Sequence, residues 1–231
     1  MTPALLIPFA EPAGYAETSL LQDELVAARQ QDRIPDVVLV LEHKPVITLG
    51  IRARREHLLL APELLRQRGI ALEHSPRGGD VTYHAPGQLV LYPILKLTGA
   101  EADAHDYVTR LEEAAIRTAA HYGVEARRRT GKTGAWTEQG KLAAIGVKIR
   151  RWVTSHGMSF NVNLDLDGFS LIVPCGLHGE PVTSLQAILG NKTPPLAEVQ
   201  EALLREFAAL THRSLRPACL EEVKRAGERV S

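Results

Sequence analysis

The chain has 231 residues, of which 45% are hydrophobic and 23% are charged. Lysine plus arginine and aspartate plus glutamate balance at 27 each, which excludes a general electrostatic attraction to nucleic acid or to an anionic membrane. The length is sufficient to bury one substantial core. Because we find no internal repeat, low-complexity segment or linker, we predict a single domain over residues 1–231.

The N-terminus and the cysteine content predict a compartment. Residues 1–8 lack a basic start and a long apolar run, so they do not resemble a signal peptide. No apolar stretch approaches the ~20 residues that span a bilayer. The two cysteines are Cys175 and Cys219, and we expect a soluble cytoplasmic protein in which both are reduced.

Hydrophobic periodicity predicts the elements of the first third of the chain. Apolar residues at helical spacing indicate a helix over 17–30, and the β-branched run 37–41 indicates a buried strand. Pro62 is well placed as the first residue of a short helix, because its missing N–H is not needed there. A strand over 70–73 follows.

Residues 77–88 combine a glycine pair, a short β-rich run and a Pro-Gly turn that leads into the apolar run 89–95. The simplest interpretation is two strands joined by a turn, and a plain β-hairpin with no functional role is an equal alternative. The pair Gly78-Gly79 would let the backbone approach a ligand closely. Arg77 could bind a carboxylate or phosphate through its planar guanidinium.

The second half of the chain alternates helices with strands. The clearest helix covers 103–122 and stops at Gly123. Strand-like runs separated by turn residues over 134–165 indicate an antiparallel meander. We expect further helices around 199–207 and from about Pro217.

Cys175 stands between a proline and a glycine at the end of an apolar run. Proline fixes the backbone before the thiol and glycine frees it afterwards, so the stretch can present a nucleophile on a tight turn. The alternative is an ordinary buried cysteine that acts as a small hydrophobic residue.

Lys141 lies beside a turn in a stretch of small apolar residues. One alternative is an exposed strand lysine with no special role. A lysine next to a thiol would instead favour the reactive thiolate, and a desolvated lysine could accept a proton from an incoming amine.

The small residues of 143–146 and 157–158 offer a surface for an acyl chain. Each buried methylene contributes about 0.8 kcal/mol, so a medium chain would contribute on the order of 4–5 kcal/mol. His84 and His156 could assist proton transfer or be ordinary hydrogen-bonded histidines. The scattered histidines do not support a metal site.

Four motifs occur in order, at 77–88, 141–146, 156–161 and 174–176. Together they resemble the lipoyl(octanoyl) transferases of lipoate biosynthesis. The resemblance runs from about residue 37 to about residue 186 and departs from the family at no motif position.

This resemblance implies an α/β (α+β) fold like the catalytic domain of lipoate and biotin protein ligases, with a mixed, largely antiparallel sheet flanked by helices. It implies transfer of octanoyl from octanoyl-acyl carrier protein to a lysine of lipoyl domains, in 2-oxoacid dehydrogenase subunits and the glycine cleavage H protein. It implies no cofactor or metal. By position, Cys175 would carry the acyl group and Lys141 would be its partner. The substrate site would be lined by Arg77, Gly78, Gly79, Asp80, Val81, Thr82, Tyr83, His84, Ala144, Ile145, Gly146, Gly157, Met158 and Ser159.

Three alternatives to this function remain open on the sequence. An ATP-dependent lipoate or biotin ligase on the same fold would need nucleotide and would not need Cys175. A cysteine hydrolase would use water in place of the amine. A non-catalytic module that binds an acyl carrier would use Cys175 only structurally.

Overall fold

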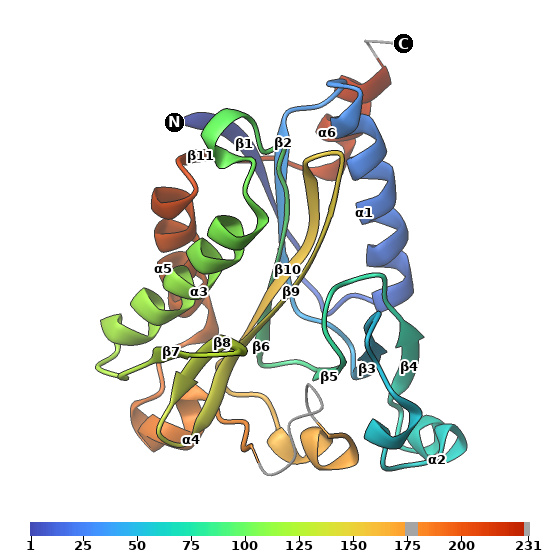
Figure 1. Ribbon diagram of the computed structural model, residues 1–231, viewed down its shortest axis with the longest axis vertical. Helices are drawn as coiled ribbons and strands as arrows, with labels where there is room; N and C mark the ends of the chain where they lie inside the picture. Colours follow the sequence, from blue (N-terminus) through green and yellow to red (C-terminus); the bar gives the residue numbers. More distant parts are fainter. Residues whose placement is uncertain (174–179, 229–231) are drawn as a thin grey trace.

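A computed structural model describes residues 1–173 and 180–228, and its described strands form two sheets (Figure 1). The larger is a mixed eight-stranded sheet in the order β11-β1-β2-β6-β10-β9-β8-β7, and the smaller has three strands in the order β4-β3-β5. The strands are β1 (Thr2–Pro8), β2 (Asp36–Leu41), β3 (Val46–Leu49), β4 (Ala71–His74), β5 (Val81–His84), β6 (Gln88–Ile94), β7 (Arg127–Arg129), β8 (Lys132–Thr137), β9 (Gly140–Arg150), β10 (Val153–Asn161) and β11 (Arg213–Pro217).

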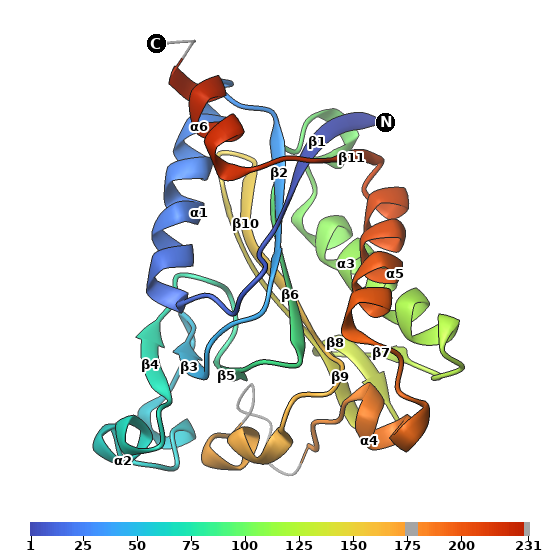
Figure 2. The ribbon, with the colours of Figure 1, turned by 180° about the vertical axis from the view of Figure 1, so that it is seen from behind.

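Helices cover both faces of the larger sheet. Figures 1 and 2 show α1 and α6 on one side of it and α3 and α5 on the other. The helices are α1 (Tyr15–Gln30), α2 (Pro62–Gln67), α3 (Ala104–His121), α4 (Leu185–Leu189), α5 (Leu196–Leu210) and α6 (Leu220–Glu228). Short 3-10 turns are η1 (Arg55–His57), η2 (Gly99–Glu101), η3 (Leu166–Leu171) and η5 (Gly190–Lys192). The mixed sheet flanked by helices agrees with the expected fold class.

The central strand β2 shows how the sequence forms this core. All six of its residues are buried. Successive side chains of a strand point to opposite faces, so Val38 and Val40 pack in the cluster with α3 and α5, whereas Val37 and Leu39 pack in the cluster with α1 and α6. Residues 37–41 are covered on both sides and are all apolar, which explains the continuous hydrophobic run, whereas Asp36 at the start of the strand is paired with arginines.

The predicted helices are confirmed, but in α1 the buried face is not made of the apolar residues alone. Asp103 caps α3, because its Oδ1 accepts from the backbone N–H groups of His105 and Asp106 at 2.8 and 3.0 Å. In α1, however, Leu20 is 67% exposed while the polar residues Thr18 and Gln22 are buried. Gln22 is buried because its Oε1 accepts from the backbone N–H of His156, at 2.7 Å, on the sheet below.

Residues 77–95 do contain the two predicted strands joined by a turn, β5 and β6, but the alternative of a plain β-hairpin is wrong. β5 pairs with β3 in the smaller sheet, whereas β6 pairs with β2 and β10 in the larger one. The Pro-Gly turn between them therefore carries the chain from one sheet to the other. The meander of β8, β9 and β10 is antiparallel, as predicted. Sequence reasoning missed β1 and β11, which pair with each other in parallel.

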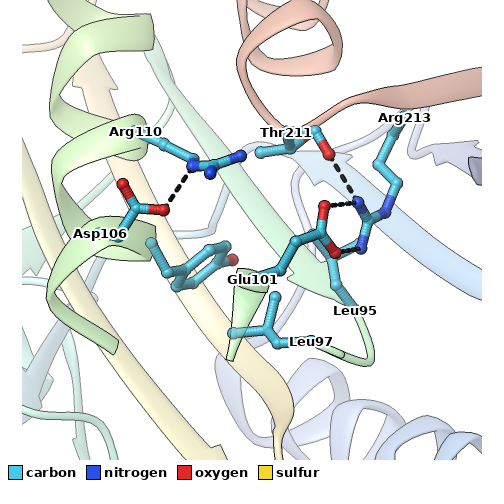
Figure 3. Close-up of a pocket in the computed structure, with 8 residues that line it drawn as sticks. Leu95, Leu97, Glu101, Asp106, Arg110, Thr211 and Arg213 are labelled. Atoms are coloured by element: carbon cyan, nitrogen blue, oxygen red, sulfur yellow. Dashed lines mark hydrogen bonds and ion pairs between the residues drawn. The ribbon is translucent and has the colours of Figure 1, made fainter. Parts of the chain in front are cut away.

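A buried ion cluster joins β2, η2 and β11. Arg213 Nε donates to Asp36 Oδ2 at 2.8 Å, and its two terminal nitrogens contact both carboxylate oxygens of Glu101 (Figure 3). Hydrogen bonding from Arg213 holds the pKa of Glu101 below its ordinary value. Asp36 also accepts from Arg29 Nε at 2.7 Å, so this cluster fixes β2, β11 and α1 to one another. Within the described residues, no helix is long and apolar enough to cross a membrane.

Candidate active site

A cavity of about 620 Å³ lies where the loop of residues 77–80 meets β9. Its wall includes six residues that the sequence assigns to the site: Gly78, Gly79, Asp80, Lys141, Ile145 and Gly146. The backbone N–H of Gly78 donates to Val147 O at 2.9 Å. A Cβ on Gly146 would lie only 2.9 Å from Gly78 O, so glycine is required where loop and strand meet.

A second, much smaller cavity of about 10 Å³ adjoins Lys141. Three more of the expected residues line it, namely Thr82, Ala144 and Ser159. Because Lys141 lines both cavities, its side chain stands at the boundary between them.

Lys141 is buried, with 6% of its surface exposed, and it lies against an aromatic ring. Its Nζ is 4.7 Å from the centroid of the Trp136 ring, and the Arg129 guanidinium carbon is also 4.7 Å from that centroid. Trp136 and Lys141 are direct partners across the β8–β9 pair. Such cation–π contacts restrict the position of an ammonium group. Trp136 was absent from the predicted site, although turn residues lie between the two strand-like runs that carry Trp136 and Lys141, so a hairpin that pairs them could have been inferred.

The backbone of Lys141 is paired with the segment that begins at residue 180, directly after residues 174–179, which lie outside the described part of the chain. Its N–H donates to Pro181 O at 2.9 Å, and its carbonyl accepts from the N–H of Thr183 at 3.0 Å. On the other flank, the N–H of Val173 donates to the carbonyl of His57 at 2.8 Å. His57 and Lys141 line the same cavity. Both flanks of residues 174–179 are therefore fixed at this cavity. Cys175 itself lies outside the described residues.

Arg77 is buried and shapes the glycine loop. Its Nη2 donates to Thr48 O at 2.9 Å and to Asp80 O at 2.7 Å, and its Nη1 donates to Gly78 O at 3.1 Å. A guanidinium that spans a loop in this way fixes the curvature of residues 77–80. The structure thus places Arg77 behind the cavity wall.

Five further predicted residues lie away from the two cavities. Val81 and Tyr83 pack in the hydrophobic cluster of the smaller sheet, and Met158 packs in the cluster with α3 and α5. Gly157 lies against β6, where a Cβ would come within 2.2 Å of Leu91 O. His84 is buried beneath Gln88.

A hydrogen-bonded chain connects His84 to the residues beside Lys141. His84 Nδ1 lies 2.6 Å from Gln88 Oε1, and Gln88 Nε2 donates to Asn161 Oδ1 at 2.9 Å. Asn161 Nδ2 donates to Thr183 O at 2.8 Å. Because an amide oxygen only accepts, His84 carries its proton on Nδ1. The chain joins β5, β6 and β10 to the segment that pairs with Lys141.

Sequence reasoning also missed a cluster of buried histidines and tyrosines behind the site. His43 Nε2 lies 2.8 Å from the Tyr92 hydroxyl, and its ring centroid is 5.5 Å from that of His84. Burial lowers the pKa of His43 from 6.5 to about 4 and that of His156 to about 3, and it lowers that of His84 well below 6.5. All three rings are therefore neutral at pH 7. His43 stands in a turn motif whose sequence carries no sign of this burial.

The arginine run 127–129, the most basic stretch in the sequence, is largely paired with acids. Arg128 contacts Glu112 at 3.1 Å and Glu113 at 2.8 Å. Arg129 contacts Glu180 at 2.9 Å, and Lys132 also pairs with Glu180. Hydrogen bonding from Lys132 lowers the pKa of Glu180. This pairing leaves little excess positive charge beside β7.

Comparison with known proteins assigns this arrangement to a class. The family model described as "Lipoyl protein ligase A/B catalytic domain" matches residues 14–208. Solved structures of lipoate protein ligases share this fold. A bipartite lipoate protein ligase from Thermoplasma acidophilum has a TM-score of 0.73 and 17% identity, and the match covers 99% of this chain and 91% of that one. A lipoate-protein ligase A bound with ATP has a TM-score of 0.73 and 18% identity, and the match covers 100% of this chain and 94% of that one. The chain belongs to this family of catalytic domains.

Curated relatives narrow the assignment. An octanoyltransferase of Chloroflexus aggregans is 48% identical over 199 residues, covering 85% of this chain and 90% of that protein. An octanoyltransferase of Solibacter usitatus is 49% identical over 196 residues, covering 85% and 88%. The protein is accordingly an acyltransferase of the octanoyltransferase type, which acts in lipoate biosynthesis.

Proposed function

We propose that the enzyme moves the octanoyl group from octanoyl-acyl carrier protein to a specific lysine of a lipoyl domain in two steps, through a thioester on Cys175. The acceptors are lipoyl domains of 2-oxoacid dehydrogenase subunits and of the glycine cleavage H protein. The archaeal ligase that shares this fold is described together with its E2 lipoyl domain, which supports this class of acceptor.

One observation carries the proposal: the described residues on both sides of 174–179 are bonded to residues of the cavity that contains Lys141. A chain advances at most ~3.3–3.6 Å per residue, so Cys175 can lie no more than about 7 Å along the chain from Val173. Val173 is bonded to His57 in the wall of that cavity. This short chain distance from Val173 supports a role for the Cys175 thiol at this cavity.

The chemistry needs no external energy source. In the first step the Cys175 thiolate attacks the thioester carbonyl of the donor, and the sulfur of the carrier leaves as a thiolate, so one thioester replaces another. In the second step the amine of the acceptor lysine attacks the new thioester. An amide forms, the Cys175 thiolate leaves, and a proton is lost from the amine. This step is favourable because an amide is more stable than a thioester.

Lys141 serves both steps in this proposal. As an ammonium it stabilises the thiolate of Cys175, and as an amine it accepts the proton from the attacking lysine. The ring of Trp136 fixes its position, and the pairing of its backbone with Pro181 and Thr183 holds it against the chain that leads back to residue 179. The thiol and the amine titrate together as one pair.

The remaining site residues take two roles. Gly78, Gly79, Ile145 and Gly146 line the cavity that would receive the acyl thioester; the three glycines carry no side chain and so leave room for it, and Ile145 offers an apolar contact. Arg77, His84, Gly157 and Met158 support that wall from behind. Asp80 and Thr82 lie at the two cavities, while Val81 and Tyr83, on β5, pack in the hydrophobic cluster of the smaller sheet.

Intact-mass measurement tests the proposal. The protein is mixed with octanoyl-acyl carrier protein without a lipoyl domain, and the mass is recorded before and after hydroxylamine. We expect a hydroxylamine-sensitive octanoyl adduct in the wild type and none in Cys175→Ala. The matched control is Cys219→Ala, which removes an exposed free thiol and should retain the adduct.

Other results would contradict the proposal. An adduct that persists in Cys175→Ala would place the acyl group on another residue. Transfer by Cys175→Ala that requires ATP would identify a ligase mechanism. Release of free octanoate without a lipoyl domain, at the rate of transfer, would identify a hydrolase.

A further inference from the structure

A groove of about 810 Å³ lies on the smaller sheet, outside the site described above. It is formed by the end of β3, the segment 50–61 and β4, in the region of α2 at the lower right of Figure 1. Apolar side chains dominate its wall, and two of them are unusually open to solvent: Ile51 is 71% exposed and Leu59 is 57% exposed. Exposed apolar side chains gathered at one groove indicate a binding surface.

The groove is continuous with the candidate active site. Arg54 lines both the groove and the cavity that contains Lys141. The segment between them is bonded to the glycine loop, because the N–H of Ile51 donates to Arg77 O at 3.1 Å and that of Arg52 donates to Gly79 O at 3.0 Å. One side of this segment therefore faces the groove and the other supports the loop of the site.

The same segment carries unbalanced positive charge. Residues 51–69 contain five arginines and two glutamates, in a chain with no net charge. Arg54 contacts Glu56 at 3.5 Å, with both side chains about 70% exposed, and such pairs are weak. Within residues 1–173 and 180–228, no acidic side chain pairs with Arg52 or Arg55. This contrasts with Arg128 and Arg129, which are paired.

We propose that this groove docks the acyl donor, an acidic carrier protein that bears its octanoyl thioester on a flexible arm. This inference rests on the proposed function. Arg52, Arg54 and Arg55 attract acidic side chains of the carrier, and Ile51 and Leu59 pack against apolar residues on its surface. Opposite charges of this kind mainly increase the rate of encounter and set the orientation. Arg54 stands where the arm passes from the groove into the cavity.

The experiment compares two donors with one acceptor. Steady-state transfer to a lipoyl domain is measured with octanoyl-acyl carrier protein and with octanoyl-pantetheine, an uncharged small thioester that has no carrier. The variant is Arg55→Glu, which lines the groove but not the cavity. The matched control is Arg151→Glu, an exposed arginine at the turn between β9 and β10. A second variant, Ile51→Ser, tests the apolar contact without changing charge.

We expect Arg55→Glu to raise KM for the carrier-bound donor about tenfold and to change kcat/KM for octanoyl-pantetheine less than twofold. Ile51→Ser should give the same selective loss to a smaller extent. Added salt should raise the wild-type KM for the carrier-bound donor and have little effect in Arg55→Glu. Arg151→Glu should match the wild type with both donors.

Three outcomes would overturn the inference. An equal loss of kcat/KM with both donors in Arg55→Glu would show an effect on the active site rather than on docking of the carrier. An unchanged KM for the carrier-bound donor would show that the carrier docks elsewhere. If Arg55→Glu raised only the KM for the lipoyl domain, the groove would bind the acceptor rather than the acyl donor. If the wild type instead used neither donor, the proposed function itself would fail, which separates the two failures.

Discussion

Trp136 and Lys141 face each other across the β8–β9 pair, with the ammonium nitrogen 4.7 Å from the centroid of the indole ring. The ring is 1% exposed and its Nε1 donates to Lys132 O at 2.8 Å, so its orientation is fixed. A flexible lysine on a rigid aromatic face has few positions available. The β8–β9 hairpin therefore fixes the position of the Lys141 amine in the absence of substrate.

Removal of the aromatic face should impair transfer. Trp136→Leu is expected to lower kcat for octanoyl transfer about tenfold, because a cation–π contact contributes about 0.5–2 kcal/mol and positions the amine. Trp136→Phe keeps a ring and should lose less. The measurement is steady-state transfer, normalised to the folded fraction by circular dichroism. Equal rates for Trp136→Leu and the wild type would contradict a positioning role.

The contact between the glycine loop and β9 should not tolerate a methyl group. In Gly146→Ala the added Cβ would lie 2.9 Å from Gly78 O, so the loop must move away from the strand. We expect a loss of at least about tenfold in kcat/KM, since misplacement of about 1 Å at a site can cost a hundredfold. The matched control is Gly14→Ala, whose Cβ would meet only the flexible side chain of Glu17. Gly146→Ala with full activity would contradict this account.

Stability should fall as the pH decreases below 6.5. The unfolded chain protonates its histidines near that value, whereas burial lowers the pKa of His43 to about 4 and of His156 to about 3 in the folded protein. Between those pH values the unfolded state binds more protons, so it gains stability relative to the folded state. At about 1.4 kcal/mol per pKa unit, His43 alone accounts for on the order of 3 kcal/mol.

Urea unfolding at pH 7.5, 6.5 and 5.5 measures this dependence. The free energy of unfolding should decrease with each step, and His43→Gln should show a smaller slope. A free energy of unfolding that is constant over this range would contradict the neutral, buried state of these rings.

The ion cluster of Arg213 should stabilise the fold without affecting the site. Arg213→Met leaves the carboxylates of Asp36 and Glu101 without this partner, and breaking a buried pair costs about 3–5 kcal/mol. The matched control is Arg216→Met, which removes a pair whose side chains are 61% and 44% exposed and should cost less than about 1 kcal/mol. Urea unfolding distinguishes them. Similar free energies of unfolding for the two variants would show that burial of the cluster contributes nothing.

The sequence by itself determined the elements whose signal is local. The buried strand β2 and the helix α3 follow from a continuous apolar run and from apolar residues at helical spacing after a capping aspartate. The meander of β8, β9 and β10 follows from its turns. The motifs also identified the family and eight of the residues that share a cavity wall with Lys141, because the chemistry of a site constrains residue types at fixed positions.

Only the tertiary structure decided which distant segments meet. β1 and β11, which lie near opposite ends of the chain, pair in parallel. β5 pairs with β3 in the smaller sheet rather than with β6, the next strand in the sequence. Neither of these two pairings has a local signal in the sequence. The same holds for the burial of His43 and for the place of Arg54 between the groove and the cavity. Hydrogen bonds and packing between segments set these positions, and such long-range contacts depend on the whole fold rather than on any stretch of sequence.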